Sequence, residues 1–192
     1  MFGAVLDFMF PPQCGGCDTT GSGLCERCEP PLPAVRFATE TLSGRAVGRY
    51  EGNFRRAMLA FKDGRRDVGI ALGRLLRERL EISSPLVPVP TTGRRAAERG
   101  FDGSVLLAAQ TDCTVWDVLT QVAGDSQRGR TRNERLVARR RFACAPLPEK
   151  GGRVVLLDDV ATTGATLEDC AATLRARGAI VERAIVLARA MP

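Results

Sequence analysis

Two adjacent acidic residues, Asp158 and Asp159, stand between an apolar run and a turn rich in hydroxyl groups. The preceding residues 154–157 are all aliphatic, which is typical of a strand buried on both faces of a parallel sheet. The turn after the acids holds Thr162, Thr163, Gly164 and Thr166. Ligands of open α/β sheets bind beyond the carboxyl ends of the strands. This stretch therefore predicts a binding site.

The turn is expected to lead into a helix that begins near Thr166 or Leu167 and is stopped by Gly178, with a second strand over residues 180–187. The free N–H groups and the positive dipole end of such a helix attract phosphate, and Gly164 would let the backbone approach it. Ionised carboxylates only accept hydrogen bonds, so they would bind sugar hydroxyls or a metal. Phosphate on the turn and hydroxyls on the acids together indicate a ribose 5-phosphate.

The turn has no lysine, as a Walker A loop would, and no G-x-G-x-x-G. Instead the stretch resembles the phosphoribosyl-pyrophosphate (PRPP) motif of type I phosphoribosyltransferases. That resemblance implies that Asp158 and Asp159 contact the ribose of PRPP, bound with Mg²⁺, and take part in catalysis. It also implies that the turn binds the 5-phosphate, through Ala161, Thr162, Thr163, Gly164, Ala165 and Thr166. A buried strand with an N-capped helix is the plainer alternative, but it leaves the acid pair unexplained.

Two C-x-x-C pairs, seven residues apart, lie near the start of the chain: Cys14, Cys17, Cys25 and Cys28. Four thiolates at this spacing can surround one Zn²⁺ in a closed, structural site. Two disulfides or a redox C-x-x-C pair are the alternatives. Nothing suggests export, and a cytoplasmic chain keeps its thiols reduced, which favours zinc.

Composition limits the class of protein. The 192 residues are enough for one α/β domain with a small appendage. No apolar run approaches the length of a membrane span, and residues 1–10 lack the features of a signal peptide and are expected to form a short packed helix. The net charge of +6 favours anionic partners. The absence of histidine excludes Ser-His-Asp and Cys-His catalysis and any His-ligated metal.

A second anion site is predicted after the strand expected over residues 86–90. Its loop comprises Thr91, Thr92, Gly93, Arg94 and Arg95, and Arg99 follows. Asp102 is expected to start the next helix. Two amphipathic helices should precede the strand, the first with its apolar positions between Phe54 and Phe61, and the second capped by Asp67. The cations mostly on the other side of the first helix fit a solvated face or an anion-binding edge equally well; they are Arg55, Arg56, Lys62, Arg65 and Arg66.

The order of motifs resembles the ComF family, which includes ComFC-type and GntX-type proteins. The motifs are the C-x-x-C pairs, Y-x-G at 50–52, K-x-G at 62–64, V-P-V-P at 87–90, R-G-F at 99–101 and the PRPP motif. The resemblance implies that residues 91–95 form the pyrophosphate loop, and that Arg99 takes part in catalysis and belongs to a loop that closes over the active site. Asp102 stands where relatives usually have Asn, which leaves the role of that contact open.

A strand is expected over residues 114–119, with Trp116 at its edge, and residues 121–141 are polar and hold seven arginines. These arginines predict either a solvated helix or a site for single-stranded DNA. The candidate DNA contacts are Arg128, Arg130, Arg139, Arg140 and Arg141. Few aromatic residues flank them, although stacking platforms are usual in such grooves.

The sequence thus predicts an α/β, parallel-sheet phosphoribosyltransferase-type domain over residues 34–192, and an N-terminal helix and four-cysteine zinc knuckle over residues 1–33. We expect a cytoplasmic protein that binds PRPP with Mg²⁺ and is linked to DNA uptake or nucleotide metabolism; the sequence leaves open whether it catalyses phosphoribosyl transfer. The alternatives are a ligand sensor that binds single-stranded DNA and a scaffold that docks a competence helicase. Fold alone cannot choose among them.

Overall fold

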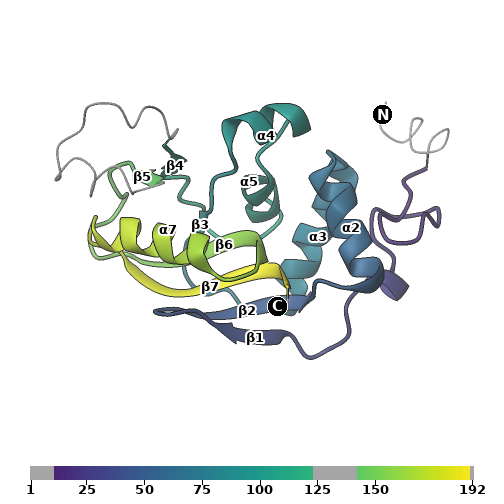
Figure 1. Ribbon diagram of the computed structural model, residues 1–192, viewed down its shortest axis with the longest axis horizontal. Coiled ribbons are helices and arrows are strands. Elements are labelled where there is room, and N and C mark those ends of the chain that lie inside the picture. The colour runs from purple at the N-terminus through teal and green to yellow at the C-terminus, as the bar shows by residue number, and fades with distance from the viewer. Residues whose placement is uncertain (1–10, 123–141, 191–192) are drawn as a thin grey trace.

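The computed structural model describes residues 11–122 and 142–190 and is built around one five-stranded sheet (Figure 1). The strand order is β1 (Val35–Ala38), β2 (Ser43–Arg49), β7 (Ile180–Arg189), β6 (Arg153–Ala161) and β3 (Leu86–Pro88). Only the β1–β2 pair is antiparallel; β2, β7, β6 and β3 run parallel. The predicted class, α/β with a mainly parallel sheet, is confirmed.

The sheet separates two hydrophobic cores, which explains the continuous apolar runs at residues 154–157 of β6 and 184–188 of β7. Alternate residues of a strand face opposite sides. Val155 and Leu157 face one core, which is shared with α2 (Gly52–Lys62), α3 (Arg66–Arg79) and α5 (Gly103–Ala108). Val154 and Leu156 face the other core, which is shared with α7 (Ala165–Arg175). Figure 1 shows α7 on one side of the sheet and α2, α3 and α5 at the other.

The β6–α7–β7 unit confirms the predicted βαβ arrangement, but β6 is longer than expected. It includes Asp158 and Asp159 and ends at Ala161, because β7 continues beside it and pairs Val160 with Ala188 and Ala161 with Arg189. The helix begins at Ala165, after Gly164 in the left-handed region at φ 86°. The expectation that the acids follow the strand end was therefore wrong, because the strand continues past them.

The helices before β3 form as predicted, with one correction at a cap. The α3 helix begins at Arg66 after Arg65, and Asp67 lies in its first turn instead of capping it. The Asp67 carboxylate is engaged by Arg65, whose Nε donates to Oδ1 at 2.9 Å and whose Nη2 donates to Oδ2 at 2.6 Å. This ion pair lowers the pKa of Asp67.

The strand expected over residues 114–119 does not form. Val115 makes only an isolated bridge to Leu86, and Trp116 is buried against Gly152 instead of lying at an edge. The regular strand in this region is β4 (Leu119–Gln121), which pairs antiparallel with β5 (Phe142–Cys144) in a separate two-stranded sheet.

The N-terminal knuckle, which includes the short 3-10 helix η1 (Glu26–Cys28), packs directly on α2 and α3. Cys14 and Cys28 belong to the same hydrophobic core as Phe61 and Leu72. The knuckle is thus joined to the α/β domain through a shared core. The helix expected over residues 1–10 lies outside the described residues. Within the described part of the chain, no helix has the length and apolar character needed to span a membrane.

Candidate functional site

A cavity of about 740 Å³ opens where β3 and β6 end, the position at which α/β sheets bind ligands. It brings together residues from both predicted anion sites, more than fifty positions apart in the sequence. The predicted residues that line it are Thr91, Thr92, Arg95, Arg99, Asp158, Asp159 and Thr166. The other predicted residues of the two loops, Gly93, Arg94 and residues 161–165, do not line it.

The acid pair occupies the β6 side of this cavity. Asp158 and Asp159 are both partly buried, and the backbone N–H of Asp159 donates to Oδ1 of Asp158 at 2.8 Å. Burial, with the neighbouring charge of Asp159, raises the pKa of Asp158 from 3.8 to about 8. In the ligand-free protein, burial therefore favours the protonated form of the Asp158 carboxyl.

Lys62, at the end of α2, supplies the cation nearest to the acids. Its Nζ lies 3.4 Å from Oδ2 of Asp159 and 5.8 Å from the centroid of the Tyr50 ring. The Nε of Arg99 donates to the backbone oxygen of Lys62 at 2.8 Å. Arg99, predicted to act on the ligand, therefore also holds the end of α2 against the cavity.

The predicted pyrophosphate loop is the start of a helix instead of a glycine turn. The α4 helix (Gly93–Arg99) is capped by Thr92, whose Oγ1 accepts from the backbone N–H of Arg95 at 3.3 Å. Arg95 faces the cavity. Arg94 forms an exposed ion pair with Glu98, with its Nε 3.0 Å from Oε1. Arg95 therefore faces the cavity, whereas Arg94 faces solvent.

Asp102 has two structural roles. Its Oδ1 accepts from the N–H groups of Ser104 and Val105, at 3.0 and 3.2 Å, and so caps α5 as predicted. Its Oδ2 accepts from the N–H of Thr91 at 2.8 Å. Because both carboxylate oxygens accept, one side chain fixes the helix and the first residue of the loop.

The predicted phosphate loop, residues 162–166, connects β6 to α7. Gly164 at φ 86° adopts a conformation that side chains disfavour. A Cβ placed on Gly164 would lie 2.2 Å from Cγ2 of Thr39, so the turn between β1 and β2 already fills that direction. The glycine is required there by its backbone and by Thr39; its predicted contact with a phosphate stays a prediction.

The cavity lining also includes residues that were not among the predicted site residues, among them Lys62, Asp63, Gln121 and Phe142. The lysine and its neighbour lie in the K-x-G motif, which was the available signal. Gln121 and Phe142 are directly opposed in the β4–β5 pair. No local pattern predicts that pairing, because 20 residues separate the two positions in the sequence. The five candidate DNA contacts, Arg128, Arg130, Arg139, Arg140 and Arg141, lie outside the described residues.

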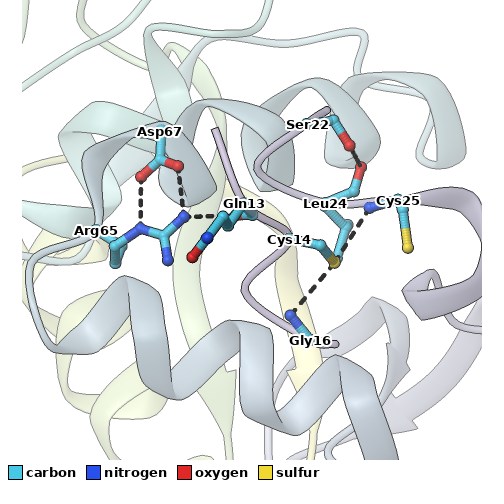
Figure 2. A network of polar contacts seen from close by, with 8 residues as sticks. All are labelled: Gln13, Cys14, Gly16, Ser22, Leu24, Cys25, Arg65 and Asp67. Atoms are coloured by element: carbon cyan, nitrogen blue, oxygen red, sulfur yellow. Dashed lines mark hydrogen bonds and ion pairs between the residues drawn. The ribbon is translucent and has the colours of Figure 1, made fainter. Parts of the chain in front are cut away.

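The four predicted metal ligands, Cys14, Cys17, Cys25 and Cys28, come together as expected. Their sulfur atoms all lie within 4.8 Å of one another, and all four cysteines are free thiols. The Sγ of Cys14 accepts hydrogen bonds from the backbone N–H groups of Gly16 and Cys25, each at 3.4 Å (Figure 2). Hydrogen bonds from Thr19 lower the pKa of Cys17 to about 6. This donor set fits Zn²⁺.

Arg65 ties the knuckle to the helices. Figure 2 shows its guanidinium between the Asp67 carboxylate and the backbone of Gln13, whose oxygen accepts from Nη2. Arg56 of α2 adds an exposed ion pair to Asp18 of the knuckle, with Nη2 3.1 Å from Oδ2. The cysteine cluster is thus attached by polar contacts as well as by the shared core.

No protein-family model matches the chain. It is 30% identical to the DNA utilization protein YhgH of Salmonella typhimurium over 203 aligned residues, covering 94% of this chain and 84% of that protein. It is 29% identical to the protein of the same name from Escherichia coli O157:H7, covering 98% of this chain and 87% of that protein.

A shorter stretch is 34% identical to the competence protein ComFC of Bacillus subtilis, over 93 residues that make up 48% of this chain and 39% of that protein. Among solved structures, the chain is similar to one described as the allosteric regulatory enzyme of purine biosynthesis. The TM-score is 0.47 and the sequence identity 18%, over 62% of this chain and 26% of that one.

Proposed function

The chain belongs to the ComF family, and from this premise we propose that its cavity binds PRPP, or ribose 5-phosphate, together with Mg²⁺. The observation that supports this most directly is the composition of the cavity wall. One opening carries a carboxylate pair on β6, the hydroxyl of Thr166 in the first turn of α7, and Arg95 and Arg99 of α4. A phosphorylated sugar with a second phosphate group offers hydroxyl groups to the carboxylates and phosphate oxygens to the hydroxyl and the arginines.

In this proposal each part of the ligand has its own partner. The acids Asp158 and Asp159 accept hydrogen bonds from the ribose hydroxyls. Residues 162–166, beside the N-terminus of α7, bind the 5-phosphate. Residues 91–95 with Arg99 bind the pyrophosphate, and within this set Thr91, Thr92, Arg95 and Arg99 reach the cavity. Lys62, one of the cations for which an anion-binding edge was an alternative, adds a positive charge near the acids.

The oxygen atoms of Asp158 and Asp159 fit Mg²⁺, which prefers oxygen ligands and commonly keeps substrate phosphates among them. When bound, Mg²⁺ would neutralise charge on the pyrophosphate. The reaction that such a site supports is displacement of pyrophosphate from the anomeric carbon through an oxocarbenium-like state. Its rate would come mainly from positioning the acceptor and from cations on the leaving group.

Titration calorimetry tests the proposal. PRPP with Mg²⁺ should bind, ribose 5-phosphate should bind more weakly because it lacks the pyrophosphate, and adenosine should not bind. If neither PRPP nor ribose 5-phosphate binds in the presence of Mg²⁺, the proposal is wrong. Where PRPP binds, release of pyrophosphate in a screen of acceptor compounds separates an enzyme from a ligand sensor.

Binding of single-stranded DNA is a second candidate, supported by the names of the relatives and by the net charge of +6. The arginines between Gln121 and Phe142 would neutralise phosphates, so binding should be independent of sequence and fall steeply with salt. Replacing Arg139, Arg140 and Arg141 with Ala should lower both the affinity and the salt slope. Unchanged values for both would rule out this segment as the DNA site.

A further inference from the structure

The turn between β1 and β2 is bound to the first turn of α7, although the two segments are 127–129 positions apart in the sequence. Glu168 accepts hydrogen bonds from the Thr39 hydroxyl and, at 2.6 Å, from the backbone N–H of Thr41. Its other carboxylate oxygen accepts from the Thr41 hydroxyl at 2.6 Å. One carboxylate therefore joins three donors of the same turn.

Other contacts make this turn a firm support. The backbone N–H of Thr39 donates to the oxygen of Leu42 at 2.9 Å, which closes the turn, and the Leu42 side chain is buried in the core beneath α7. Farther along the helix, Nη1 of Arg175 donates to Oγ1 of Thr41 at 2.6 Å. The turn is thus held by both ends of α7 and by its own buried leucine.

Thr39 is also the residue that lies against the predicted phosphate loop. Its methyl group fills the space beside Gly164, where a Cβ would come within 2.2 Å of it. Within the loop, the hydrogen bond from the N–H of Ala165 to Oγ1 of Thr163 is long, at 3.4 Å. The oxygen of Gly164 accepts from the N–H of Glu168 at 3.0 Å, and the oxygen of Thr162 accepts from Nη1 of Arg189. Thr39 adds a restraint on Gly164 from the β1–β2 turn.

We propose that Thr39 and Glu168 are positioning residues that hold the loop at residues 162–166 in the conformation that binds a phosphate group. This inference rests on the proposed phosphate site. Glu168 fixes the Thr39 hydroxyl, and the Thr39 methyl then keeps Gly164 in place. A pre-ordered loop loses less conformational entropy on binding, which strengthens affinity without any contact between Glu168 and the ligand.

The contacts of Glu168 also turn its negative charge away from the N-terminus of α7, where the phosphate is proposed to bind. A carboxylate in the first turn of a helix competes with an anionic ligand for the positive end of the helix dipole. Here the Glu168 carboxylate is directed to the β1–β2 turn. Burial opposes its ionisation, but the hydrogen bonds from Thr39 and Thr41 outweigh that effect and lower its pKa.

The test compares Glu168→Ala, Glu168→Gln and Thr39→Val with a matched control, Glu182→Ala. Glu182 also bonds a hydroxyl and an arginine, with Ser84 Oγ and Arg153 Nε each at 2.6 Å. Its place near the start of β7 is at the end of the sheet opposite to the cavity. Amide hydrogen exchange of residues 162–167 in ligand-free protein and calorimetry with PRPP, Mg²⁺ and inorganic phosphate are the two readouts.

Glu168→Ala and Thr39→Val should each speed exchange in the loop and weaken PRPP and phosphate binding by about tenfold or more. Glu168→Gln should keep most of the slow exchange in the loop and most of the ligand affinity, because an amide oxygen can still accept from Thr39 and Thr41. Glu182→Ala should change neither readout. Exchange in Glu168→Ala no faster than in the control overturns the inference, as does faster exchange with unchanged affinity.

Wild-type protein that binds none of the ligands would instead contradict the proposed phosphate site. The exchange comparison, which needs no ligand, then decides by itself whether Glu168 and Thr39 order the loop. Measurements on the same set of variants thus distinguish an incorrect phosphate site from an incorrect positioning role for Glu168 and Thr39.

Discussion

Lys62 at the end of α2 lies with its Nζ 3.4 Å from Oδ2 of Asp159 on β6, across the mouth of the cavity. Both side chains are mostly buried, 28% and 20% exposed, so the pair is screened less than a surface ion pair. The contact places one positive charge beside the Asp159 carboxylate, which would otherwise repel an anionic ligand. It links the ribose side of the proposed site to the helix that Arg99 holds in place.

Removing this charge should weaken ligand binding. Lys62→Gln keeps most of the side-chain length but leaves the acids without their neighbouring cation. We expect the dissociation constant for PRPP to rise by about ten- to a hundredfold, since a hydrogen bond to a charged group contributes roughly 1.5–3 kcal/mol. Lys62→Arg, which keeps the charge, should lose much less. Calorimetry measures both, and equal affinities for wild type and Lys62→Gln would contradict the role.

Asp158 should make the ligand-free protein less stable as the pH rises. Its pKa is raised from 3.8 to about 8 by burial and by Asp159, so the folded state holds the proton more tightly than the unfolded chain. Between these two values the unfolded chain has lost the proton and the folded protein has not. Stability therefore falls as pH rises through this window, from near pH 4 to near pH 8.

Asp158→Asn removes this dependence. In ligand-free protein with chelator, the melting temperature of the variant should exceed that of wild type at pH 8 by about 2–4 °C, for roughly 1 kcal/mol. The difference should shrink towards pH 4. The same variant should bind PRPP about ten- to a hundredfold more weakly. A melting temperature equal to that of wild type at both pH values would show that burial does not hold the proton on Asp158.

The zinc knuckle should contribute to the stability of the whole domain, because Cys14 and Cys28 belong to the same core as α2 and α3. Purified protein should contain about one Zn²⁺ per chain. A strong chelator or Cys14→Ser should lower the melting temperature by about 5 °C or more, since metal binding is coupled to folding. Elemental analysis and calorimetric melting measure the two quantities.

Cys113→Ser is the control for the zinc prediction. Cys113 is a partly buried free thiol outside the cysteine cluster. Its replacement should leave the zinc content unchanged. Protein without metal, in which mass spectrometry finds two disulfides among the four clustered cysteines, would exclude the metal site.

The predictable parts of the fold are those carried by strong local patterns. The aliphatic run at residues 154–157 predicted β6 because only a strand buried on both faces needs four such residues in succession. The spacing of the four cysteines predicted their cluster because short loops can bring such ligands together. In both cases the residues that form the sequence pattern are the same residues that form the structure, so no distant contact has to be known.

The predictions that were wrong or missing concern contacts between residues that are far apart in the sequence. The end of β6 was misplaced because the β7 strand beside it, through Ala188 and Arg189, extends the ladder past Asp159. The contact of Glu168 with Thr39 joins segments 129 positions apart, and no pattern around either residue signals it. Lys62 was named in a motif and among the cations of a possible anion-binding edge, but not as a neighbour of Asp159, because that approach requires the packing of α2 beside the sheet.

Gly164 and Asp159 should affect ligand binding in different ways. Gly164→Ala places a methyl group at φ 86° and within 2.2 Å of Thr39, so the loop must change shape. This variant should lose PRPP and inorganic phosphate alike. Asp159→Asn keeps the loop intact, so it should lose about ten- to a hundredfold in affinity for PRPP and ribose 5-phosphate and still bind phosphate. Calorimetry with the three ligands gives the comparison.

Gly178→Ala is the control that separates backbone strain from position. Gly178 has a similar left-handed conformation, at φ 91°, but a Cβ there would meet nothing within 4 Å. Both glycine variants should lose about 1 kcal/mol of stability to backbone strain. Gly164→Ala should lose more through Thr39, and it alone should lose the ligands. If Gly178→Ala impairs binding as much, general destabilisation explains the effect. If Gly164→Ala binds phosphate as wild type does, the phosphate does not contact this loop.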